Sequence, residues 1–163
     1  TEKQFYDLVY NKFNPNIPRE ELMSKGRQFL KKIFTEKLHY MDGFDDIQPD
    51  LKIKYKLALV TSTGTELVNH IEELLSIYSR FDIVLTSADT KAHKPMPDPY
   101  LNAMDRLGFT PSECVVVEDS IQGIKAGKAA GCRVIALEGS IDKKFLSEAD
   151  YVIPHLHDIQ NIL

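Results

Sequence analysis

Apolar positions along the chain follow two different rhythms, and the change between them falls near residue 41. Over 5–13 and again over 22–38, apolar side chains recur every three or four residues, which is the spacing of an amphipathic helix. The segment 14–18 separates these stretches, because its two prolines interrupt a helix. The turn-rich stretch 41–49 follows, and we place a domain boundary there. Residues 1–41 are therefore expected to form a purely helical region.

Beyond this boundary, short and mostly apolar runs alternate with further helical stretches. Such runs are typical of strands that are covered on both faces. The alternation predicts an α/β fold in which right-handed crossovers place helices on both faces of a parallel sheet. We expect a Rossmann-like core over 42–163 and a partial helical cap at the N-terminus over 1–41. The expected strands are 57–60, 82–85, 114–117, 133–137 and 151–153, and the expected helices are 67–78, 100–107 and 120–130.

Composition narrows the range of functions. The 163 residues carry 20 Lys and Arg against 24 Asp and Glu, a net charge of −4, so the chain has no basic footprint for nucleic acid or an anionic membrane. No apolar run is long enough to span a bilayer. Cys114 and Cys132 both lie in apolar runs, which argues against a disulfide scaffold and favours a reducing, cytoplasmic location. The sequence leaves the oligomeric state open.

Polar residues follow three of the expected strands, where a parallel sheet places its ligands. The first strand ends in the run 61–65, Thr-Ser-Thr-Gly-Thr. Hydroxyls and backbone N–H groups that enter a helix N-terminus can hold an anion, although the same residues also cap a helix without any ligand. The loop after the second strand carries Lys94 among three prolines, which hold its backbone in place. A lysine held in this way can neutralise a phosphate, whereas a solvated surface lysine is the plainer alternative.

The third strand ends in Glu118 and Asp119. Adjacent carboxylates beside a buried strand are costly without a compensating charge, and a divalent cation is the usual partner. Oxygen ligands alone suit Mg²⁺. Asp119 or Ser120 could also simply cap the next helix, but one cap needs only one of them.

These clusters, in this order, resemble the second, third and fourth sequence motifs of the haloacid dehalogenase-like hydrolases. The likeness is strongest to the phosphatases and beta-phosphoglucomutases that have a small helical cap. It covers roughly residues 42 to 155. Three segments match the family motifs. They are the apolar strand that ends in Thr-Ser at 61–62, the run Lys-Pro-Met-Pro-Asp-Pro-Tyr at 94–100, and the segment 113–131 with its Glu-Asp pair at 118–119.

The resemblance implies a role for each matching residue. Thr61 and Ser62 would hold the phosphoryl group, Lys94 would bridge that phosphate and the nucleophile, and Glu118 and Asp119 would bind Mg²⁺. Thr61 and Lys94 would thus belong to the catalytic machinery. The family's chemistry is attack by an aspartate on a small phosphorylated metabolite, followed by hydrolysis of the aspartyl-phosphate.

The chain departs from the family in one respect. The family's first motif, Asp-x-Asp after an apolar strand, has no counterpart in residues 1–60, because no apolar strand precedes the acids of 42–46. The family places that strand in the middle of the sheet, between the strands that end at Thr61 and at Glu118. We therefore expect an N-terminal truncation, a gap in the sheet, and no turnover by these 163 residues alone.

Three functions fit this pattern. The first is a Mg²⁺-dependent phosphatase of small phosphorylated metabolites. The second is a sugar-phosphate mutase, which uses the same aspartyl-phosphate but returns the phosphate to a sugar. The third is a non-catalytic remnant that binds phosphate or a partner protein.

Overall fold

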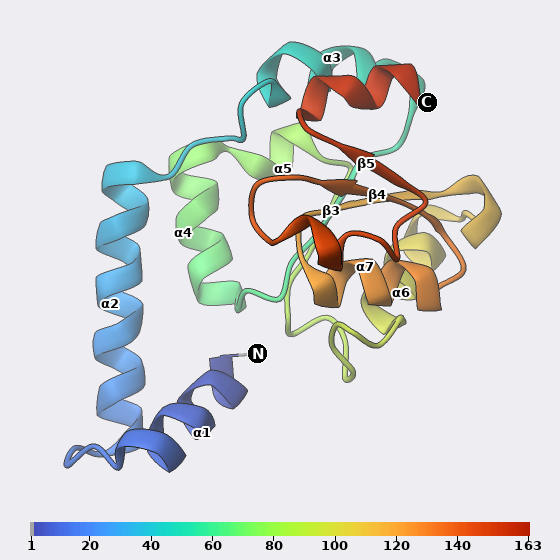
Figure 1. The fold of residues 1–163 in the computed structure, drawn as a ribbon. Helices are drawn as coiled ribbons and strands as arrows, with labels where there is room; N and C mark the ends of the chain where they lie inside the picture. The colour runs from blue at the N-terminus through green and yellow to red at the C-terminus, as the bar shows by residue number, and fades with distance from the viewer. Residues whose placement is uncertain (1) are drawn as a thin grey trace.

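The computed structural model describes residues 2–163, and it divides into an α/β part and two N-terminal helices that project from it (Figure 1). The elements in chain order are α1 Glu2–Phe13, α2 Arg19–Lys37, α3 Phe44–Lys54, β1 Ala58–Val60, α4 Thr65–Leu75, α5 Ile77–Arg80, β2 Ile83–Leu85, α6 Asp98–Leu107, η1 Pro111–Glu113, β3 Val115–Glu118, α7 Ile121–Ala129, β4 Arg133–Leu137, η2 Lys143–Phe145, β5 Tyr151–Ile153 and η3 Leu156–Asn161.

All five expected strands are present within a residue of the expected bounds. They form two parallel sheets rather than one, β1–β2 and β3–β4–β5. Within residues 2–163, β1 pairs only with β2 and β3 only with β4, so one edge of each has no strand beside it. The α/β class with a Rossmann-like parallel arrangement is confirmed, and its sheet is split at the position where the gap was expected.

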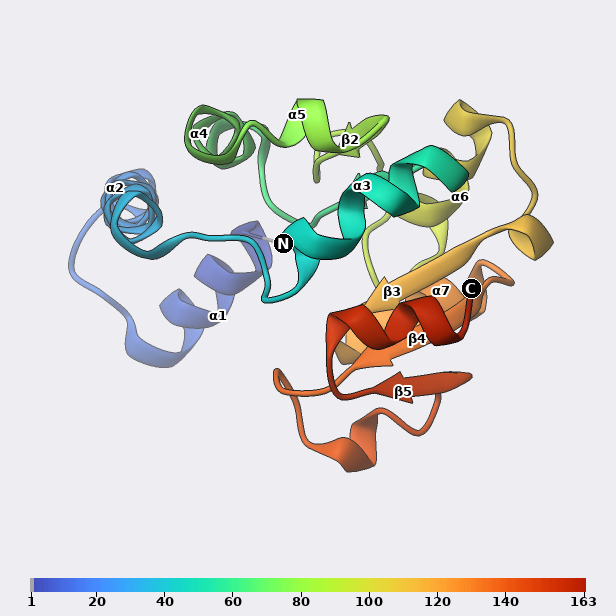
Figure 2. The ribbon, with the colours of Figure 1, turned by 90° about the horizontal axis from the view of Figure 1, so that it is seen from above.

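Helices cover both faces of β3–β4–β5 (Figure 2). On one face, α6 and α7 pack against β3 and β4 in a cluster that includes Tyr100, Ile124 and Val134. On the other face, α3 and η3 pack against β4 and β5 through Ile47, Ile159 and their neighbours. The middle strand β4 is consequently the most buried of the five.

Two sequence expectations were wrong in detail. The turn-rich stretch 41–49 contains the start of α3, which runs from 44 to 54, because Gly43 adopts a left-handed conformation before it and Asp45 and Asp46 place negative charge in its first turn. Pro49 lies inside this helix and removes one backbone donor from it. The helical stretch 67–78 breaks at Ser76, whose φ of 51° ends α4 and begins α5.

The two N-terminal helices cross at an angle, and salt bridges join α2 to the α/β part (Figure 1). Arg27 and Lys31 of α2 both bind Glu66 of α4. Tyr6 of α1 is buried against Gly26 of α2, where a Cβ would overlap its ring hydroxyl. No side chain of α2 is fully buried. The proposed domain boundary near residue 42 stays a prediction.

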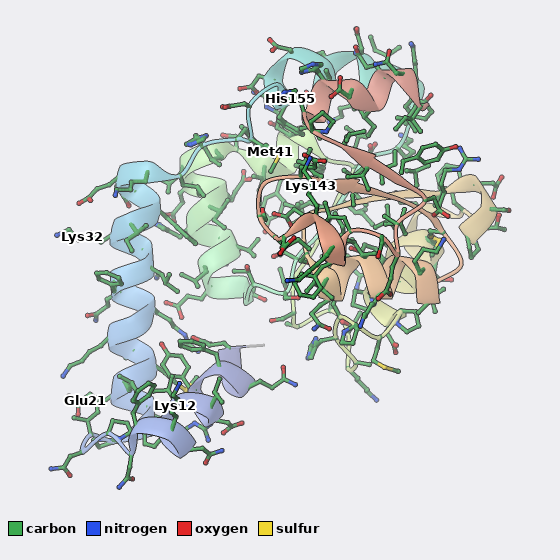
Figure 3. The ribbon with its side chains drawn as sticks, in the orientation of Figure 1. Lys12, Glu21, Lys32, Met41, Lys143 and His155 are labelled. Atoms are coloured by element: carbon green, nitrogen blue, oxygen red, sulfur yellow. The ribbon has the colours of Figure 1, made fainter. Side chains whose placement is uncertain are left out.

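Figure 3 shows Lys12, Glu21 and Lys32 on this helical pair, at a distance from Met41, Lys143 and His155 on the α/β side. Several large apolar side chains of the pair are exposed, namely Phe5, Leu8, Phe13, Phe29 and Leu30. Among the described helices, none is long and apolar enough to cross a membrane.

Candidate functional site

The carboxyl ends of β1 and β3 face a cavity of about 820 Å³. Its walls include the last residues of both strands, the loop that holds Lys94, and Gln4 and Met41 from the N-terminal region. The structure therefore brings all five sequence-predicted site residues to one place: Thr61, Ser62, Lys94, Glu118 and Asp119 all line this cavity.

At the end of β1, the loop is shaped by its own hydroxyls. The Thr61 N–H donates to the Leu85 carbonyl at 2.9 Å and extends the pairing with β2 by one bond. The Thr61 hydroxyl donates to that of Thr63 at 3.0 Å, and the Thr63 N–H donates back to the Thr61 hydroxyl at 3.1 Å. Ser62 is exposed, and α4 begins after Gly64 without a side-chain cap. The first turn of α4 therefore has no side-chain cap, and a helix N-terminus of this kind favours an anion.

Lys94 bridges the two sheets. Its ammonium donates to the Val60 carbonyl of β1 at 3.0 Å and to Glu118 Oε1 of β3 at 2.5 Å. It also lies 4.9 Å from the centre of the Tyr100 ring, within range of a cation–π interaction. Its side chain is 11% exposed. A lysine so enclosed and paired is held, as the proline-rich loop predicts.

Asp89 ties this loop to its surroundings. Its carboxylate accepts the Thr86 N–H at 2.7 Å, the Thr86 hydroxyl at 3.0 Å and Arg106 Nη2 at 3.0 Å. Its carbonyl accepts from Asn102 at 2.8 Å. The Thr86 N–H, followed by the Thr86 hydroxyl and Arg106, holds the pKa of Asp89 below its usual range despite partial burial.

Glu118 and Asp119 differ in their environments although they are adjacent. The Glu118 carboxylate accepts from Lys94, from the Tyr100 hydroxyl and from the Ser120 hydroxyl. Burial and then the charge of Glu118 raise the pKa of Tyr100 far above its usual range, so this hydroxyl keeps its proton. Within residues 2–163, the one hydrogen bond to the Asp119 carboxylate is the Ser140 hydroxyl, which donates to Oδ2 at 2.7 Å.

Sequence reasoning missed Tyr100 and Ser140 as members of this site. Tyr100 ends the motif segment 94–100 and begins an expected helix, but nothing in the sequence indicates where its hydroxyl points. Ser140 follows β4, so the rule that ligands gather after parallel strands would have drawn attention to it.

The two acids after β3 would supply only part of the oxygen ligands that a Mg²⁺ site needs. Within residues 2–163, no three His, Cys, Asp or Glu side chains lie together as metal ligands. Asp119 has one carboxylate oxygen without a protein partner among the described residues, a donor that suits Mg²⁺. A complete site would need further oxygens from water, phosphate or another segment.

Known proteins are similar to this chain in sequence and in fold. Hexitol phosphatase A of Escherichia coli (strain K12) is 44% identical over 78 residues, and glycerol-1-phosphate phosphohydrolase 1 of Saccharomyces cerevisiae is 32% identical over 152 residues. These matches cover 48% and 88% of this chain, but only 36% and 60% of the two relatives. Pyrophosphatase PpaX of Bacillus velezensis is 32% identical over 147 residues, which are 88% of this chain and 68% of the relative.

Among solved structures, a Thermotoga maritima protein with a provisional assignment as a beta-phosphoglucomutase superposes with a TM-score of 0.82 at 28% identity. The superposition covers 99% of this chain and 77% of that one. The sequence model that describes haloacid dehalogenase-like hydrolases matches residues 5–137, most of the chain and all three motif segments up to the fourth strand. Motifs, fold and relatives therefore agree, and the chain belongs to the haloacid dehalogenase-like hydrolase family.

Proposed function

We propose that this chain is the larger part of a Mg²⁺-dependent phosphatase that acts on small phosphorylated metabolites. The observation that carries the proposal is the convergence of Thr61, Ser62, Lys94 and Asp119 on one cavity between two strand ends. Phosphoryl transfer needs mainly positioning and neutralisation of charge, and these groups can supply both. The phosphatases among the relatives support the same reaction class.

In this proposal each residue acts on the phosphoryl group. The Thr61 and Ser62 hydroxyls and the N–H groups at the start of α4 orient its oxygens. Lys94 neutralises negative charge on the phosphate and on the attacking group. When bound, Mg²⁺ supplies further neutralisation, with Asp119 as a ligand. The cytoplasmic location expected from the sequence belongs to the same proposal.

In this proposal the nucleophile comes from a segment outside residues 2–163. In the proposed reaction, an aspartate carboxylate forms a bond to phosphorus while the bond to the metabolite's oxygen breaks, and that oxygen takes a proton. Water then hydrolyses the aspartyl-phosphate, which releases inorganic phosphate and restores the carboxylate. Among the described residues, β1 and β3 each have one edge without a strand beside it, and a strand added between them would deliver this aspartate beside Lys94.

The test is phosphate release by two proteins. One is residues 1–163 alone, and the other carries an N-terminal extension with an apolar strand and an Asp-x-Asp motif. A panel of sugar-alcohol phosphates, glycerol phosphate, sugar phosphates and pyrophosphate is assayed with and without Mg²⁺. We expect release only by the extended protein with Mg²⁺, and loss of it in Lys94→Met.

Two results would count against the proposal. An extended protein that folds but releases phosphate from no member of the panel removes the assignment as a phosphatase. Turnover by residues 1–163 alone, abolished in Asp119→Ala, shows that no outside aspartate is needed.

The mutase alternative draws support from the fold of the Thermotoga maritima structure. A mutase would convert a sugar phosphate to its isomer when supplied with a sugar bisphosphate, with little free phosphate formed. Measuring isomer and free phosphate in the same reaction separates the two. The non-catalytic alternative predicts binding of phosphate without either product.

A further inference from the structure

The Glu118 carboxylate lies at the wall of the cavity, but protein donors surround it. Its side chain is 9% exposed. Oε1 accepts from the Lys94 ammonium and the Tyr100 hydroxyl, and Oε2 accepts the Ser120 hydroxyl at 2.8 Å. Both carboxylate oxygens are therefore committed to protein donors.

The helix that follows β3 is shaped to admit this carboxylate. Ser120 caps α7 by accepting the Gly123 N–H at 3.0 Å while it donates to Glu118. A Cβ at Gly123 would overlap the Glu118 carboxyl group. The missing side chain thus lets the carboxylate lie against the first turn of α7.

Asp119 differs from Glu118 in how few protein donors contact its carboxylate. It lies on the same strand end and lines the same cavity, yet a single serine hydroxyl occupies one of its oxygens. A divalent cation needs carboxylate oxygens that can leave their hydrogen-bond donors at low cost. Asp119 meets this requirement, whereas Glu118 would have to give up an ammonium, a phenol and a serine hydroxyl.

We propose that Glu118 is a positioning residue that fixes the Lys94 ammonium between β1 and β3, and that Asp119 of the pair is the one available to a metal. The inference rests on the proposed function for what Lys94 then does to a phosphate. The effect of Glu118 on Lys94 does not depend on that function. When Glu118 loses its charge, the nearly buried Lys94 ammonium loses both its counter-charge and the acceptor that fixes its direction.

The ammonium itself reports on this arrangement. The N–H signals of a lysine ammonium are visible by ¹⁵N NMR at low temperature and mildly acidic pH only when hydrogen bonds slow its exchange with water. We expect one protected ammonium signal in residues 1–163 that is absent in Lys94→Met and present in Lys91→Met, whose lysine is exposed in the same loop.

The decisive comparison is Glu118→Gln with Asp119→Asn. We expect the Lys94 signal to disappear in Glu118→Gln and to remain in Asp119→Asn. Gly123→Ala provides a second variant that keeps every charge: its new methyl group displaces the carboxylate, so the Lys94 signal should shift or broaden. A Lys94 signal that is unchanged in Glu118→Gln and Gly123→Ala overturns the proposal.

Mn²⁺ titration separates the two acids further. Paramagnetic broadening of amides at the β3 end should persist in Glu118→Gln and vanish in Asp119→Asn. The proposal is also overturned if Glu118→Gln loses this broadening as Asp119→Asn does. The ammonium signal decides the role of Glu118 whether or not the protein hydrolyses any ester, so failure of the phosphatase proposal would be recognised separately.

Discussion

The two halves of the split sheet use the same plan, strand then polar loop then helix, with opposite results. After β3, the loop encloses its own charge: Glu118 is nearly buried, and Ser120 caps α7 with its side chain. After β1, the loop stays open: Ser62 is exposed, and Gly64 begins α4 without a side-chain cap. The Lys94 ammonium donates to the last residue of β1, through the Val60 carbonyl, and to the last residue of β3, through the Glu118 carboxylate. The closed half can hold the lysine in place, while the open half leaves donors for an anion.

Packing differs between the halves in the same sense. Val134, Ile135 and Ala136 of β4 are completely buried, with helices on both faces. In the other sheet, β1 has no fully buried residue and β2 has only Leu85. The half that positions the charge is thus the rigidly packed one.

The largest expected effect tests this packing difference. Ile135→Ala should lower the free energy of unfolding by about 2–5 kcal/mol, because the site is closed on both faces and cannot collapse easily. Ile83→Ala in β2 should cost clearly less, because that side chain is only partly buried. Urea denaturation of both variants measures the difference. Equal losses would mean that the halves are equally packed.

A smaller effect compares the two glycines beside the site. Gly123→Ala should cost about 1–3 kcal/mol, because the new methyl group has to displace the Glu118 carboxyl. Gly64→Ala meets only Ser87 Oγ at 3.9 Å, so its cost should stay below about 1 kcal/mol, the effect of alanine at a helix N-cap. The denaturation midpoints of the two variants check this. A Gly123→Ala variant as stable as Gly64→Ala would contradict the close approach between Gly123 and the Glu118 carboxyl.

The helix caps give the next contrast. Ser120→Ala should lower the free energy of unfolding by about 1 kcal/mol, because it removes the side-chain acceptor for the Gly123 N–H. Ser62→Ala at the open loop should stay within about 0.5 kcal/mol, as is usual at exposed positions. Thermal unfolding followed by circular dichroism resolves the two, and the reverse order would contradict the comparison.

The smallest effect concerns the loop that carries Lys94. The pKa of Asp89 is lowered on folding, so the folded state binds its proton less readily than the unfolded chain. The stability that Asp89 contributes is therefore present above its unfolded pKa near 4 and is lost as pH falls through the lower folded value. Asp89→Asn should cost several tenths to about 1 kcal/mol at neutral pH and progressively less in acid. If Asp89→Asn lowers the free energy of unfolding by the same amount at neutral and acidic pH, the negative charge of Asp89 does not stabilise the fold.

Sequence patterns predicted the fold and the meeting of the site residues well. Apolar runs locate every strand, and the rule that ligands gather at strand ends brings Thr61, Lys94 and Asp119 together without any coordinates. What stayed hidden depends on the direction of single side chains. Glu118 and Asp119 look equivalent in sequence, and the structure separates them through the donors around Glu118 and its close approach to Gly123.

Helical spacing also predicted α1 and α2 but not what they bury. An apolar stripe indicates that a helix has a face to cover, not which partner covers it. Phe29 lies on such a stripe and is 65% exposed, whereas Tyr6 finds a partner at Gly26 because a glycine there leaves space for its ring.

The most direct test of the account is a titration of residues 1–163 with inorganic phosphate, followed by backbone amide shifts. We predict saturable shifts at Thr61 to Thr65, the open loop, that are lost in Lys94→Met and retained in Lys91→Met. Absence of any shift in that loop, or equal shifts in both lysine variants, would contradict the claim that Lys94 and the open end of β1 together form a phosphate site.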